Sequence, residues 1–99
     1  MAIKQVRVST SAQGSPIVDV PDVDVWVPNG DEVQWTGTGP YTIDFAGNSP
    51  FSSSSFSCPD GSSTPLLSGP INVGATGTYK YNVKIGSKVL DPNVKVHPP

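Results

Sequence analysis

The sequence contains a single cysteine, Cys58, and a single histidine, His97. These residue types serve as soft metal ligands, nucleophiles and bases. Cys58 precedes Pro59 in a serine-rich stretch, and no lysine, arginine or histidine stands beside it to favour the reactive thiolate. We therefore expect an ordinary thiol, since free cysteine behaves mainly as a small apolar side chain. His97 is followed only by two prolines, which predicts a frayed terminal residue rather than a base or a ligand.

Other chemical signatures are missing from the sequence. No Gly-x-Ser-x-Gly elbow occurs, and a lone terminal histidine is a poor base for a serine hydrolase. Several aspartates cluster in the first third of the chain, but they lack the spaced loop, with its closing glutamate, that binds calcium. We interpret them as solvated carboxylates and one turn residue: Asp19, Asp22, Asp24 and Asp31. We expect no catalytic residue, no enzyme activity and no cofactor.

Aromatic side chains give the candidate contacts with a partner. Trp26 alternates with Val23 and Val25, so its phase places it on the strand face opposite the valines. An exposed tryptophan there could anchor a partner or stack on a sugar ring. The alternatives are that both strand faces are covered, or that a bulge at Pro28 shifts the phase. The candidate partner-contact residues are Trp26, Tyr41, Phe51 and Phe56.

One strand pattern is clearer than any other in the sequence. Over residues 76–85, Tyr79, Tyr81, Val83 and Ile85 alternate with Lys80, Asn82 and Lys84, which predicts one half-buried antiparallel strand. Shorter alternations predict strands at 3–8, 17–20, 23–27, 33–35, 41–45, 71–73 and 94–96. Asn29-Gly30 favours a tight hairpin turn. Residues 46–70 have little periodicity, although Leu66 and Leu67 should return to the core.

These patterns predict an all-β protein of about seven or eight strands, built as a Greek-key β-sandwich of two antiparallel sheets. The length of 99 residues suits one domain spanning 1–99. The net charge of −2 gives no basic patch for nucleic acid. No run of about 20 apolar residues predicts a membrane span. The start fits a cytoplasmic protein if Met1 is native, and fits an exported one if a signal peptide has been removed.

Three segments in order carry a resemblance to a known family. They are Gly30-Asp31-Glu32-Val33-Gln34-Trp35, Pro40-Tyr41-Thr42-Ile43-Asp44-Phe45 and Gly77-Thr78-Tyr79-Lys80-Tyr81, followed by a short hydrophobic strand. Together they cover about the last 70 residues, and in this order the chain resembles the cupredoxins. The resemblance implies a cupredoxin-like sandwich with a copper site at one end.

The resemblance also places the copper ligands, and the sequence departs from them. Tyr41 stands where the family has its first histidine, and Val83 stands where it has its cysteine. A blue-copper centre takes two imidazoles and one thiolate, whereas this chain has one histidine in all. We therefore expect a copper-free member of the family.

Three functions follow, in order of preference. The first is a small non-catalytic interaction module that presents an end loop or an edge strand to another protein or an unknown ligand. The serine-rich loop around residues 52–63 is one such surface. The second is a metal-handling protein with a non-blue site at His97 or Cys58. The third is an enzyme whose site the sequence does not reveal.

Overall fold

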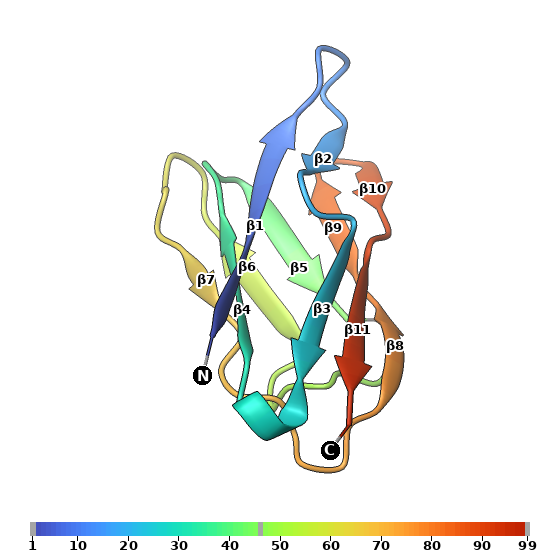
Figure 1. Cartoon of the computed structure of the whole chain (residues 1–99). Helices are drawn as coiled ribbons and strands as arrows, with labels where there is room; N and C mark the ends of the chain where they lie inside the picture. Colours follow the sequence, from blue (N-terminus) through green and yellow to red (C-terminus); the bar gives the residue numbers. More distant parts are fainter. Residues whose placement is uncertain (1, 46, 99) are drawn as a thin grey trace.

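The computed structural model describes residues 2–45 and 47–98. Met1, Ala46 and Pro99 lie outside the described residues. The expectation that rests on Met1 and the first residue of the irregular segment 46–70 therefore lie outside them too. Apart from one turn of 3-10 helix, every element is a strand (Figure 1). The elements are β1 (Ile3–Thr10), β2 (Pro16–Val18), β3 (Asp22–Trp26), η1 (Val27–Asn29), β4 (Glu32–Thr36), β5 (Tyr41–Asp44), β6 (Ser55–Cys58), β7 (Leu66–Leu67), β8 (Gly77–Lys80), β9 (Asn82–Ile85), β10 (Lys88–Leu90) and β11 (Asn93–His97).

Hydrogen bonds join these strands into three ladders. The first has the order β2-β1-β4-β7, the second β10-β9-β5-β6 and the third β3-β11-β8. The second and third ladders are parts of one layer, because β8 and β9 are a single stretch of chain interrupted only at Tyr81. The fold is therefore a sandwich of two layers, and the all-β prediction is confirmed.

The core lies between the layers and is built by the predicted alternation. Each strand that alternates apolar and polar residues buries its apolar set, since successive side chains point to opposite faces. Fully buried side chains include Val6, Val33 and Trp35 from the first layer and Val25, Ile43, Tyr81, Val83 and Val94 from the second. Trp35 is the centre of an aromatic cluster, with the rings of Tyr81 and Phe56 at 5.5 and 5.3 Å between centroids.

The long strand predicted over residues 76–85 is interrupted. Its alternation is correct, because Tyr81 and Val83 are buried while Lys80 and Lys84 are exposed. However, the backbone N–H of Tyr81 donates to the carbonyl of Pro92, and the chain there passes from one ladder to the next. The two halves pair with different neighbours, β8 with β11 and β9 with β5 and β10.

Two other expectations about pairing are wrong. The sheets are mixed, because β1 pairs with β4 in parallel and β3 pairs with β11 in parallel. The Asn29-Gly30 step does not close a hairpin either. It ends the 3-10 helix, with Gly30 in the left-handed region at φ 63°, and carries the chain from β3 in one layer to β4 in the other. A hairpin signal and a crossover between layers use the same turn chemistry.

The segment 46–70 is more regular than expected. It contains β6, which pairs with β5, and β7, which pairs with β4. Phe51 also forms an isolated bridge with Ile71. β6 alternates exposed serines with the half-buried Phe56 and the buried Cys58, but the pattern is only four residues long and follows a run of serines. Leu66 is half-buried against the core, but Leu67 is 47% exposed, so its predicted return to the core is wrong.

Candidate binding face

The outer face of the ladder β3-β11-β8 carries an ordered set of polar and aromatic side chains. Register places them in rows that cross the strands. One row holds Asp22, Asn93 and Lys80, and the next holds Asp24, Lys95 and Thr78. The last row, at the end of the ladder, holds Trp26 and His97. These eight residues are called the binding face below.

Trp26 and His97 form a flat aromatic pair. Their ring centroids are 4.4 Å apart and the planes differ by 15°, which is a stacked arrangement. The Nε2 atom of His97 lies 3.0 Å from Oδ1 of Asp24, and this contact fixes the imidazole ring in its plane. The ammonium of Lys4 lies 5.4 Å from the Trp26 ring centroid, within cation–π range. Trp26 remains 38% exposed, so an aromatic surface is presented to solvent in a defined orientation.

Asp31 holds the backbone beneath this pair. It is 1% exposed, and its two carboxylate oxygens accept hydrogen bonds from the N–H groups of Ala2 and Trp26, at 3.2 and 3.0 Å. A buried carboxylate needs such donors to replace water. Asp31 therefore ties the N-terminal segment, which carries Lys4, to the end of β3, which carries Trp26. Asp31 follows directly on the turn at Gly30, as expected, but it is buried there.

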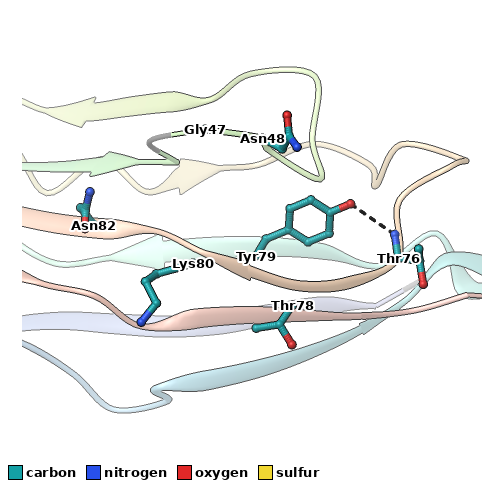
Figure 2. Close-up of a pocket in the computed structure, with 7 residues that line it drawn as sticks. All are labelled: Gly47, Asn48, Thr76, Thr78, Tyr79, Lys80 and Asn82. Atoms are coloured by element: carbon teal, nitrogen blue, oxygen red, sulfur yellow. Dashed lines mark hydrogen bonds between the residues drawn. The ribbon is translucent and has the colours of Figure 1, made fainter.

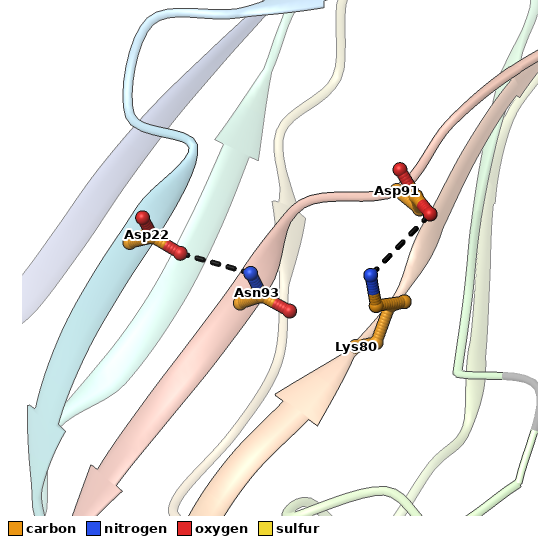
Figure 3. A network of polar contacts seen from close by, with 4 residues as sticks. All are labelled: Asp22, Lys80, Asp91 and Asn93. Atoms are coloured by element: carbon orange, nitrogen blue, oxygen red, sulfur yellow. Dashed lines mark hydrogen bonds and ion pairs between the residues drawn. The ribbon is translucent and has the colours of Figure 1, made fainter.

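Two separate side-chain contacts involve the first row, one within it and one from Lys80 to Asp91 outside it (Figure 3). The side-chain amide of Asn93 donates to Asp22 at 2.9 Å, and the ammonium of Lys80 lies 3.4 Å from a carboxylate oxygen of Asp91. Lys80 and Asp91 are both more than half exposed, so this ion pair adds little stability. Charges of both signs thus alternate over the binding face.

A hollow borders the binding face on each side. One, of about 310 Å³, lies along β3 and is lined by Lys4, Gln5, Val20, Asp22, Val23, Asp24 and Trp26. The other, of about 580 Å³, lies along β8 (Figure 2). In the hollow along β8 the Tyr79 hydroxyl accepts a hydrogen bond from the backbone N–H of Thr76 at 3.3 Å. Lys80 is the one charged side chain among the residues that line this hollow. Both hollows are open and mix polar with apolar lining, unlike the enclosed apolar pockets that hold most small ligands.

The candidate partner-contact residues separate into three groups. Trp26 lies on the binding face. Phe56 is half-buried against Trp35 on β6. Tyr41 and Phe51 are each only 2% exposed, so neither side chain is presented on the surface. Their large apolar rings are used in the core instead.

Burial also shapes the chemistry of Tyr41. It raises the pKa of Tyr41 to about 12, and the neighbouring Cys58 adds to that shift. Cys58 is buried, and its thiol donates to the carbonyl of Ser62 at 3.3 Å. An inaccessible thiol beside a neutral phenol agrees with the ordinary cysteine expected from the sequence.

His97 is the functional candidate that sequence reasoning undervalued. It is not frayed, because it belongs to β11 and stacks on Trp26. One signal was available. Val23-Asp24-Val25-Trp26 and Val94-Lys95-Val96-His97 share the pattern Val-x-Val-aromatic, which fits two neighbouring strands in parallel register.

No group of three or more potential metal-ligating side chains occurs in the part of the chain that the structure describes. Cys58 and His97 lie beyond opposite ends of β4: His97 pairs with Trp26, before the turn that leads into β4, and Cys58 pairs with Tyr41, after the turn that follows it. Neither helps the other to form a site within one chain. Helices long and apolar enough to cross a bilayer are also missing from residues 2–45 and 47–98.

Comparison with known proteins supports the fold alone. The structure is similar over its whole length to the solved structure of a pseudoazurin from Sinorhizobium meliltoi, with a TM-score of 0.59, 15% sequence identity and 76% of that chain covered. Pseudoazurins are cupredoxins, so the predicted cupredoxin-like β-sandwich is confirmed. No protein-family model matches the sequence. No curated protein matches it either.

Proposed function

We propose that this chain is a non-catalytic interaction module on a cupredoxin-like scaffold, without a type 1 copper centre. The binding face meets its protein partner. The observation that carries the proposal is the exposed Trp26–His97 stack, held in one orientation by Asp24 and Asp31. A ring that is already fixed loses little entropy on binding.

The donor set argues against a type 1 centre. Such a centre needs two imidazoles and a thiolate, and the chain has one histidine and one cysteine. The positions that correspond to the family's first histidine and cysteine are Tyr41 and Val83, and both are packed in the core. Apolar and phenolic side chains thus fill the end of the sandwich where cupredoxins hold copper.

The composition of the binding face favours a protein partner. Tryptophan is enriched among the residues that dominate interface energies, and a polar rim around it supplies specificity. Here the rim is the mixed row of Asp24, Lys95 and Thr78 beside the stack. Alternating charges reject partners with the wrong charge pattern and steer the right one into register.

Site-directed photo-crosslinking in the native cells tests this proposal. A photoreactive amino acid replaces Lys95, at the centre of the binding face, and in a matched control it replaces Arg7, exposed on the outer face of the other layer. We expect one discrete crosslinked protein from position 95, lost when Trp26→Ala is added, and none from position 7. The same bands from both positions would contradict the proposal.

The captured protein is then purified and its affinity measured. Removal of an anchor tryptophan costs about 2 kcal/mol or more, so Trp26→Ala should weaken binding by at least ~ten-fold. Gln13→Ala, in the exposed turn after β1, is the matched control and should leave the affinity unchanged. Equal affinities for Trp26→Ala and the unmodified chain would rule out the binding face as the contact.

A further inference from the structure

The outer edge of β6 is an open strand edge with a defined set of free backbone groups. Within the described residues, β6 pairs with β5 on one side and with no strand on the other. The N–H of Phe45 donates to Ser54, which continues the β5–β6 register one step beyond Asp44 and Ser55. In an antiparallel pair, alternate residues face the neighbour. Phe56 and Cys58 therefore face β5, while the N–H and C=O groups of Ser55 and Ser57 face outward.

This edge lacks the usual protection against pairing. Natural edge strands are blocked by charged side chains, especially lysine, by proline within the strand or by bulges. No charged residue occurs between Asp44 and Asp60, and β6 consists of Ser55, Phe56, Ser57 and Cys58 in regular register. Ser55 and Ser57 are both exposed. Their short side chains leave the backbone accessible to a second strand.

We propose that β6 pairs with β6 of a second copy of this chain, antiparallel about a two-fold axis at Phe56. The register is self-complementary, because Ser55 of each copy then lies opposite Ser57 of the other. The four outward N–H and C=O groups of each copy find partners, and the two Phe56 side chains meet across the axis. Such close aromatic pairs stabilise adjacent antiparallel strands. No like charges are brought together, which favours a second copy over a charged peptide.

The consequence is a continuous sheet through both copies. In each copy β6 is at one edge of the layer and β3 is at the other. The two binding faces therefore lie at the far ends of the dimer and stay free. Two linked copies of one contact raise the effective affinity for a partner that carries repeated sites. The dimer is a separate claim from the contact itself, and either can hold without the other.

Charge exchange at the edge tests the dimer. Sedimentation equilibrium is run from about 10 μM to 1 mM, and the unmodified chain should associate to a dimer. The double variant Ser55→Lys/Ser57→Lys places lysine opposite lysine, so its dimer dissociation constant should rise at least ten-fold. Ser55→Asp/Ser57→Asp should do the same. An equimolar mixture of the two variants should restore the dimer, because every lysine then lies opposite an aspartate.

Controls separate the edge from net charge and from folding. Gln13→Lys/Ser87→Lys adds the same charge in two exposed turns and should dimerise like the unmodified chain. The restored mixture would show that both charged variants are folded. A chain that stays monomeric up to 1 mM would overturn the proposal. So would dimerisation that the charged variants leave unchanged, or a mixture that fails to associate.

Discussion

The stacked pair of Trp26 and His97 should behave as one energetic unit. We consider the variants Trp26→Ala, His97→Ala and the double variant. Stacked aromatic pairs contribute about 0.5–1.5 kcal/mol beyond their buried area, as measured by double-mutant cycles. Both rings are partly exposed, with Trp26 at 38%, so the lower half of that range applies. We expect a coupling of about 0.5–1 kcal/mol in the free energy of unfolding.

Urea unfolding followed by fluorescence measures this coupling. The chain has two tryptophans, and Trp35 remains as a fully buried reporter after Trp26 is removed. The Trp26→Ala variant alone should lose about 2 kcal/mol, because the indole, although 38% exposed, removes much of its large apolar surface from water. A matched cycle pairs His97→Ala with Ile17→Ala on the distant strand β2, where the two losses should add within about 0.5 kcal/mol.

Independent losses at Trp26 and His97 would contradict a coupled pair. If the losses at Trp26 and His97 add within about 0.3 kcal/mol, the stack does not hold the rings together. The aromatic surface would then be free to reorient, and the argument from a preformed contact would fail. A coupling that vanishes with Asp24→Ala would instead show that the carboxylate fixes the imidazole.

Three further predictions concern buried polar groups. The Tyr81 hydroxyl is buried without a hydrogen-bond partner among the described residues, so Tyr81→Phe should leave the free energy of unfolding unchanged or raise it by about 1 kcal/mol; a loss above that in urea unfolding would reveal a bond. Burial raises the pKa of Tyr81 to about 12, and burial also raises that of Tyr41 to about 12. Both folded pKa values lie above the unfolded value near 10, so the contribution of the two neutral tyrosines to the free energy of unfolding should be fully present below pH 10. It should be lost as the pH rises to about 12, by on the order of 2 kcal/mol for Tyr81. A free energy of unfolding that does not change over this pH range would contradict the prediction. Asp31→Ala should lower the free energy of unfolding by about 3 kcal/mol in the same assay, because two backbone N–H groups lose their hydrogen-bond acceptor. A loss below about 1 kcal/mol would mean that water replaces the carboxylate.

The buried face of each strand was predictable from the sequence, because apolar and polar residues alternate along the strand. The alternation of Val23 and Val25 with Asp24 and Trp26 predicted an exposed indole, and the structure agrees. Local alternation reports which face is buried, since it depends only on the two-residue period of a strand. The same reasoning predicted the buried side of residues 76–85 correctly.

Strand pairing was not predictable, because it depends on residues far apart in the chain. His97 meets Trp26 only through the parallel register of β3 and β11, which no local pattern specifies. Burial of Tyr41 and Phe51 likewise depends on how two layers close over them. The strand β6 was missed because its alternation covers only four residues, Ser55 to Cys58, and follows a run of serines without any period.

We propose a cupredoxin-like scaffold without a type 1 copper centre, and copper titration of the reduced chain tests this directly. Copper(II), copper(I) and zinc are added to the unmodified chain, Cys58→Ser and His97→Ala, with absorbance and heat recorded. We predict no intense thiolate-to-copper band and superimposable traces for the three proteins, since one imidazole and one buried thiol at opposite ends cannot form the centre. An intense band at stoichiometric copper(II), lost in Cys58→Ser or His97→Ala, would contradict the account.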